Sequence, residues 1–300
     1  MRRALLLIGL SAAGCAGGGG APEGDGKLSS RLVDPAKRPP LVNALDIDPA
    51  DGDFLLTTNR GSYRIDPKTK QVTSVRGEVR ADGRRSPVGT FLELDAVGPG
   101  RLLGSGHPDR ADAGLPAYLG LMRSDDAGRT WRVLSRLGEA DLHKIVAQHG
   151  RLYAFDAVLG AILISADGGR SFTERFTPQG LVIDFVVDPE DPRYLLAATE
   201  DQLYRSDDEA TTWRGVAVGA GIRLAWAGGT VLRADSDGTI QRSTDRGQTF
   251  ARIGRVPGEP YKFESLDARP HYLALSDGTI TETKDAGETW KTVFDPADAS

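Results

Sequence analysis

The 300-residue sequence contains a single cysteine, two methionines and four histidines. One cysteine cannot form a disulfide within the chain, so an exported domain would have to be stable without one. Four histidines leave little material for a centre built from several histidine ligands. No basic run is present and the formal net charge is −5, which argues against a nucleic-acid partner. Beyond the N-terminal segment, helical periodicity is also absent.

The N-terminus has the features of an export signal. Met1–Arg3 is positively charged, and the apolar run Ala4–Leu10 is too short to span a bilayer. The next residues, Ala12-Ala13-Gly14-Cys15, resemble the bacterial lipoprotein signal, which implies lipidation of Cys15 as the mature N-terminus. We therefore predict a signal peptide over 1–14 and a flexible, Gly-rich tether over 15–40. A plain secretory signal with an incidental cysteine is the alternative.

An octet of the form [Ser/Thr]-x-Asp-x-Gly-x-[Thr/Ser]-aromatic recurs along the chain. Its copies begin 41, 41, 37 and 40 residues apart, and Ala210 replaces the glycine in the third copy. The five copies occupy residues 124–131, 165–172, 206–213, 243–250 and 283–290. A fixed period of this size is typical of a repeat architecture.

The residue types of the octet are those of a tight turn. Its Asp can accept hydrogen bonds from nearby backbone N–H groups, and its Gly can adopt a positive φ without steric cost. We therefore predict hairpin turns in which the Asp is structural, and the alternative is a row of cation or sugar sites. The Asp residues concerned are Asp126, Asp167, Asp208, Asp245 and Asp285.

Each octet belongs to a unit of four short β-rich runs joined by Gly, Asp and Pro turns. Six units align, at about 41–78, 89–136, 141–177, 181–217, 221–256 and 261–296. This arrangement predicts an all-β fold, a six-bladed β-propeller of four-stranded antiparallel blades, as one domain over 41–296. A seventh blade would require hidden strands in 27–40 or 79–88.

With this period and these octets, the chain resembles the BNR/Asp-box propellers, which include sialidases, sortilin-type receptors and photosystem assembly factors. It is most similar to a bacterial, often lipid-anchored family described as sialidase-like or glycosyl-hydrolase-like. The resemblance implies the propeller fold over residues 41 to about 294. It leaves the function open, because enzymes, receptors and scaffolds share this architecture.

The catalytic pattern of the sialidases is incomplete. Their Arg-Ile-Pro motif is Arg64-Ile65-Asp66 here. Tyr261 as nucleophile with Arg223 on a substrate carboxylate is one interpretation, and a surface tyrosine is the simpler one. A carboxylate pair for ordinary glycosidase chemistry can always be found among 42 acidic residues, so the count decides nothing. Whether the protein is an enzyme stays uncertain, and we favour a non-catalytic role.

The end of the predicted propeller opposite the octets carries the candidate binding site, and Glu93, His143, Arg223 and Glu264 are expected to begin the first strands of their units there. The loops after the second strands of units two and three exceed the minimum for the repeat, and two histidines lie beside them. The candidate ligand-binding residues are Glu93, His107, Asp109, His143, Asp156, Arg223 and Glu264. No cofactor is predicted, and a divalent metal at His107, His143 and Asp156 is weighed against structural roles for the histidines.

These features predict a monomeric binding or assembly propeller at the outer face of a membrane in the bacterial cell envelope, anchored through its lipid. The expected ligand is a glycan, a peptide or an envelope protein, and a sialidase-like glycoside hydrolase is the alternative. A deep funnel with clustered, desolvated carboxylates would favour the enzyme, and a shallow, solvated face would favour the binding protein.

Overall fold

The computed structural model describes residues 40–109, 114–219, 222–265 and 270–298. In these residues the regular structure is β-strand, apart from a short 3-10 turn, η1 (Pro296–Asp298). No helix within them has the length and apolar character needed to cross a bilayer. The predicted signal peptide, Cys15 and most of the tether lie outside the described residues.

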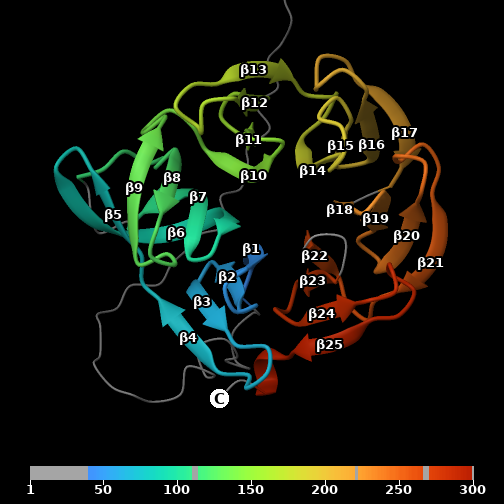
Figure 1. The fold of residues 1–300 in the computed structure, drawn as a ribbon, viewed down its shortest axis with the longest axis horizontal. Coiled ribbons are helices and arrows are strands. Elements are labelled where there is room, and N and C mark those ends of the chain that lie inside the picture. Colours follow the sequence, from blue (N-terminus) through green and yellow to red (C-terminus); the bar gives the residue numbers. More distant parts are fainter. Residues whose placement is uncertain (1–39, 110–113, 220–221, 266–269, 299–300) are drawn as a thin grey trace, which may run out of the picture.

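Five sheets each contain four strands that follow one another in sequence and pair antiparallel. They stand around a ring, with the first strand of each sheet innermost and the fourth at the rim (Figure 1). Their strands are β1 (Val42–Ile47), β2 (Phe54–Thr58), β3 (Gly61–Ile65) and β4 (Val72–Val75); β10 (Leu142–Gln148), β11 (Arg151–Asp156), β12 (Ala161–Ser165) and β13 (Thr173–Phe176); β14 (Val182–Val187), β15 (Leu195–Thr199), β16 (Gln202–Ser206) and β17 (Arg214–Val218); β18 (Arg223–Ala227), β19 (Thr230–Ala234), β20 (Thr239–Ser243) and β21 (Ala251–Arg255); β22 (Pro260–Ser265), β23 (His271–Leu275), β24 (Ile280–Thr283) and β25 (Lys291–Phe294).

The second unit of the ring differs from the other five. It contains β5 (Glu78–Ala81), β6 (Arg84–Gly98), β7 (Arg101–Pro108), β8 (Leu121–Ser124) and β9 (Thr130–Ser135). β5 pairs antiparallel with β6 and parallel with β9, which closes the five strands into a barrel.

The prediction of six four-stranded blades is therefore confirmed for five sheets and wrong for this unit. The residues 79–88, in which a hidden strand would have implied a seventh blade, do contain strand structure. That structure extends the second unit, because the long β6 turns back at its start to pair with β5.

A hydrophobic cluster fills the space between each pair of neighbouring units. Phe185 of β14, for example, is fully buried in one cluster with Tyr153 of the preceding sheet. Burial on both faces explains why the inner strands read as nearly continuous apolar runs. No described strand is shared between the first and the last sheet. Side-chain packing joins these two sheets, since Phe54 of the first and Phe294 of the last belong to the same cluster.

The octets form the turns between the third and fourth strands of their units. In every copy, the hydroxyl of the first residue and the N–H of the seventh donate to one oxygen of the central carboxylate. The hydroxyl of the seventh residue donates to the other oxygen. Ala210 takes the glycine position at a φ of +60°, so the turn keeps its left-handed backbone without glycine.

Candidate functional site

A cavity of about 580 Å³ lies on the axis of the ring, lined by residues from all six inner strands. Ile47, Val187 and Ala227, which end β1, β14 and β18, are among its lining residues. In an antiparallel sheet, the end of the first strand and the turn between the third and fourth strands lie at the same edge. The cavity therefore lies toward the end of the axis that carries the octets.

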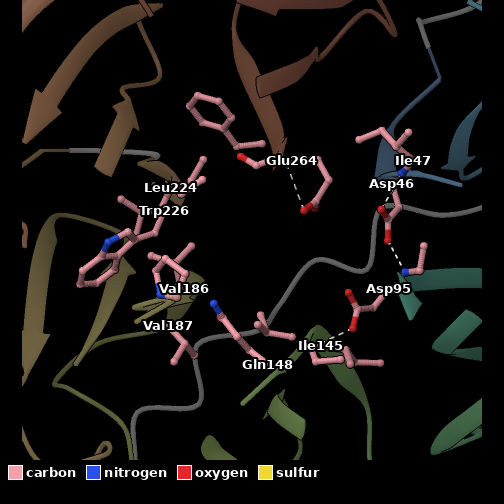
Figure 2. Close-up of a pocket in the computed structure, with 18 of the residues that line it drawn as sticks. Asp46, Ile47, Asp95, Ile145, Gln148, Val186, Val187, Leu224, Trp226 and Glu264 are labelled. Carbon is pink, nitrogen blue, oxygen red and sulfur yellow. Dashed lines mark hydrogen bonds between the residues drawn. The ribbon is translucent and has the colours of Figure 1, made fainter. Parts of the chain in front are cut away.

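The two sides of this axial cavity differ in chemistry (Figure 2). Asp46 and Asp95 lie on one side, and the carboxyl group of Glu264 points into the opening beside them. The opposite side is mostly apolar and is formed by Val186, Val187 and Leu224, with the amide of Gln148 beside them and the indole of Trp226 turned away from the opening. The cavity thus offers both a carboxyl wall and an apolar wall to one ligand.

Three aspartates, Asp46, Asp95 and Asp184, each tie one inner strand to the inner strand of the next unit. The Asp95 carboxylate accepts the N–H of Ala147 at 2.9 Å, and the Asp184 carboxylate accepts the N–H of Leu224 at 2.9 Å. Asp46 accepts the N–H of Ala96 in the same way. This repeated bond gives a structural reason for a charged residue in the middle of an apolar strand.

Two lysines compensate part of this acidic charge. The ammonium group of Lys144 lies 3.7 Å from Asp184, and that of Lys262 donates to Glu93 at 2.6 Å, from β22 to β6. Burial alone would lower the pKa of Lys144, but Asp184 and the neighbouring carboxylates raise it above its ordinary value. Lys144 is therefore held as a cation at the centre of the ring.

The remaining carboxyl groups stay short of positive charge. Burial, together with neighbouring carboxylates, raises the pKa of Asp95 and of Glu264 to about 7, although Lys144 opposes both shifts. Burial, with the charges of Glu264 and Asp95, also raises the pKa of Asp46 well above its ordinary range. Near neutral pH Asp95 and Glu264 are therefore partly protonated.

Two of the predicted site residues belong to this axial cluster. Glu93 lies in the middle of β6, and Glu264 is the second-last residue of β22. The expectation that both begin inner strands is wrong, because β6 starts at Arg84 and β22 at Pro260. Glu264 consequently lies toward the octet end of the axis and not toward the predicted end.

Three other predicted residues converge at the opposite end, around a residue that the sequence did not single out. Nε2 of His143 lies 3.1 Å from Oδ2 of Asp141, and Nε2 of His107 lies 3.7 Å from Oδ1 of the same carboxylate. Asp156, fully buried at the end of β11, accepts the N–H of Asp141 at 3.2 Å. The available signal was the position of Asp141, which directly precedes the strand that carries His143. Across the described ranges, no group of three His, Cys, Asp or Glu is arranged to hold a metal ion.

The last predicted residues are engaged elsewhere. Arg223 begins β18 as expected, and its guanidinium donates to the carbonyl of Tyr261 at 2.5 Å and stacks 5.3 Å over that ring. The two residues proposed as a nucleophile and a carboxylate-binding group are thus joined to each other. Asp109 follows β7, and its N–H donates to the carbonyl of Pro87 at 3.1 Å.

No family model matches the sequence. The chain is 37% identical over 70 residues to the photosystem II assembly lipoprotein Ycf48 of Synechococcus sp. (strain CC9902), which is 22% of this chain and 21% of that protein. It is 33% identical over 105 residues to the dispase autolysis-inducing protein of Streptomyces mobaraensis, which is 33% of this chain and 28% of that protein. The matches therefore span only between about a fifth and just over a quarter of those relatives' length.

Among solved structures, YCF48 from Cyanidioschyzon merolae overlaps 87% of this chain and 86% of its own, with a TM-score of 0.48 and 14% identity. The four-stranded sheets around a central axis are those of a β-propeller. The narrower Asp-box and sialidase-like assignments remain predictions.

Proposed function

We propose that this chain is a binding or assembly propeller that takes up a peptide or protein segment in its axial cavity. The observation that carries the proposal is the cavity itself, because about 580 Å³ falls within the roughly 300–1,000 Å³ of typical ligand pockets. In this proposal the β5–β9 barrel serves as the second blade, so that six inner strands surround the ligand.

The similarity to the photosystem II assembly lipoprotein Ycf48, over the 70 residues that match, supports a role in binding or assembly. Anchorage to a membrane through a lipid on Cys15, export to the bacterial envelope and a monomeric state complete the proposal. In a broader form of the proposal, the ligand is a glycan or an envelope protein.

A glycoside hydrolase is the second candidate, because clustered, desolvated carboxyl groups line a cavity. Hydrolysis needs two carboxyl groups that both face the scissile bond. Asp46 and Asp95 each hold an N–H of the neighbouring inner strand, which engages them in the packing of the ring. Glu264 accepts only the N–H of the adjacent Ser265, at 3.4 Å, among the hydrogen bonds of the described residues. One available carboxyl group supports binding better than glycosidic cleavage.

The test is a thermal-shift screen of the full chain against panels of short peptides and of glycans. A peptide present at 100 times its Kd should stabilise the protein by about 2.7 kcal/mol. Ala147→Trp should abolish this shift, because Ala147 lines the cavity with an exposed side chain and an indole there would fill it. Ala157→Trp, on an exposed turn at the other end of the ring, is the matched control and should keep the shift.

Two results would contradict the proposal. Peptide shifts that survive Ala147→Trp would place binding outside the cavity. Release of reducing sugar from a glycan, lost in Glu264→Gln, would instead establish the hydrolase.

A further inference from the structure

We propose that the axial cavity takes a protonated amine or guanidinium group carried on an apolar peptide segment, with the cation facing Asp46, Asp95 and Glu264. The inference rests on the proposed function and names the ligand class of that same cavity. The cation would be a lysine or arginine side chain, and its neighbours would lie against Val186, Val187 and Leu224.

The charge balance of the inner strands supports this ligand. Five carboxyl groups and two ammonium groups gather around the axis: Asp46 of β1, Glu93 and Asp95 of β6, Asp184 of β14, Glu264 of β22, Lys144 of β10 and Lys262 of β22. Lys144 pairs with Asp184 and Lys262 pairs with Glu93. The three carboxyl groups left without an ion-pair partner in the described residues are the three that line the cavity.

The inner strand β18 adds no competing cation to this wall. The guanidinium of Arg223 is held by the Tyr261 carbonyl and ring, and Arg223 is not among the residues that line the cavity. An incoming cation would therefore meet three carboxyl groups that have no ion-pair partner in the described residues, although Lys144 also lines the cavity and its charge acts on Asp95 and Glu264. The buried surroundings strengthen the attraction of a cation to these groups relative to water.

The apolar wall restricts the ligand further. Val186, Val187 and Leu224 lie across the opening from the carboxyl wall, whereas the indole of Trp226 points away from it into the cluster between two sheets (Figure 2). A free metal ion or a fully hydrated cation gains nothing from such a surface. A side chain with a methylene stem, next to other apolar residues, can use both walls at once.

Binding of a cation to this wall must release protons. An opposite charge nearby favours the ionised form of a carboxyl group. Since the pKa of Asp95 and of Glu264 lies at about 7 in the empty cavity, the ligand displaces protons from them near neutral pH. The affinity should then rise as the pH rises through about 7, while a lysine ligand stays charged throughout.

The experiment is calorimetric titration of the full chain with three blocked pentapeptides, Ac-Gly-Leu-X-Leu-Gly-amide, in which X is lysine, norleucine or glutamate. The lysine peptide should bind at least tenfold more tightly than the norleucine peptide, as expected for a charge-assisted contact. Its affinity should be about tenfold weaker at pH 6 than at pH 8, which is the linkage of one carboxyl group with a pKa of about 7. Titration at pH 7 in two buffers of different ionisation heat measures the released protons.

Variants at the two ends of β22 make the test specific. Glu264→Gln should weaken the lysine peptide at least tenfold, reduce the proton release and leave the norleucine peptide unchanged. Glu259→Gln, an exposed residue that precedes the other end of the same strand, should change none of these values.

The outcomes separate this inference from the proposed function. Equal affinity for the lysine and norleucine peptides, with no proton release, overturns the cation and leaves a peptide-binding cavity. Tighter binding of the glutamate peptide overturns the cation as well. A further outcome is that none of the three peptides binds, while n-butylammonium binds with proton release and Ala147→Trp blocks that binding. The inference that the cavity takes a cation would then hold, and the proposal of peptide binding would fail. If neither the peptides nor n-butylammonium bind, both fail.

Discussion

The carboxylates of the octets and those of the axis meet opposite environments within one fold. In the octets, the hydroxyl of Thr249, its N–H and the Ser243 hydroxyl lower the pKa of Asp245 to about 2. Similar bonds from Thr289 lower the pKa of Asp285 to about 2. On the axis, burial and neighbouring carboxylates raise the pKa of Asp95 and Glu264 to about 7.

The pKa values of the two sets of carboxylates differ because different numbers of hydrogen-bond donors and positive charges contact them. An octet carries its own donors within four residues of its Asp, so both carboxylate oxygens are occupied before any ligand arrives. On the axis, each aspartate receives one N–H from the next unit. Asp46 and Asp184 accept a second N–H from the following residue of their own strand, whereas Asp95 accepts only the one among the hydrogen bonds of the described residues. A carboxylate saturated by its own turn stabilises the fold, whereas an undersupplied one retains capacity for a cation.

The strongest test of this comparison removes the cation that the axis does have. Lys144→Met should destabilise the protein by about 3–5 kcal/mol, because it leaves Asp184 and its neighbours as uncompensated buried charge. The loss should be smaller at pH 5, where Asp95 and Glu264, whose pKa is about 7, hold their protons. Urea unfolding of the full chain measures both values.

Lys291→Met, at an exposed position of the rim strand β25, is the control and should stay within about 0.5 kcal/mol of the wild type. If Lys144→Met were no more destabilising than this control, the axial carboxyl groups would not need their cation.

A smaller effect is expected from a single octet. Asp126→Ala removes the acceptor of the Ser124 hydroxyl and of the Thr130 N–H and hydroxyl, which should cost about 1–3 kcal/mol. Peptide binding in the cavity should be unchanged, since the octet lies outside it. The adjacent Asp125→Ala, whose exposed carboxylate pairs only with arginines at the surface, should cost less than about 1 kcal/mol. A stable Asp126→Ala that no longer bound peptide would show that the octet is functional.

The octets and the sheets could be predicted from sequence because their cause is local. Each turn is contained within eight residues, and each four-strand unit within about forty. The axial cluster could not be predicted in the same way, since Asp46, Asp95 and Lys144 are about fifty residues apart and meet only when the ring closes. The sequence contained one sign of this cluster, a charged residue inside an otherwise apolar strand. It occurs in β1 (Val42–Ile47) and again in β14 (Val182–Val187).

The β5–β9 barrel and the contact of the two histidines with Asp141 are further features that could not be predicted from the sequence. β5 is four residues long and its partner β9 lies about fifty residues away in the sequence, so no local pattern predicts their parallel pairing. His107 and His143 were identified, but Asp141, which joins them, reads as one more acidic residue before a strand.

The last prediction concerns how stability depends on pH. The ordinary pKa of a glutamate is 4.5, and that of Glu264 in the folded protein is about 7. Below the unfolded value both states hold the proton, and the contribution of Glu264 to stability is complete. As the pH rises from there through 7 the unfolded chain releases the proton first, so stability falls by up to about 1.4 kcal/mol per pH unit. The octet carboxylates have the opposite sign and lose their contribution as the pH falls toward 2.

Glu264→Gln should therefore flatten the decline in unfolding free energy between pH 5 and 7, and Glu259→Gln should not. Urea unfolding at pH 5, 6 and 7 for the wild type and both variants measures the slopes. An unchanged slope in Glu264→Gln would mean that this carboxyl group is already ionised at pH 5 in the folded protein. Glu264 would then be ionised at pH 5 like the octet carboxylates, and the contrast between the two sets of carboxylates would disappear.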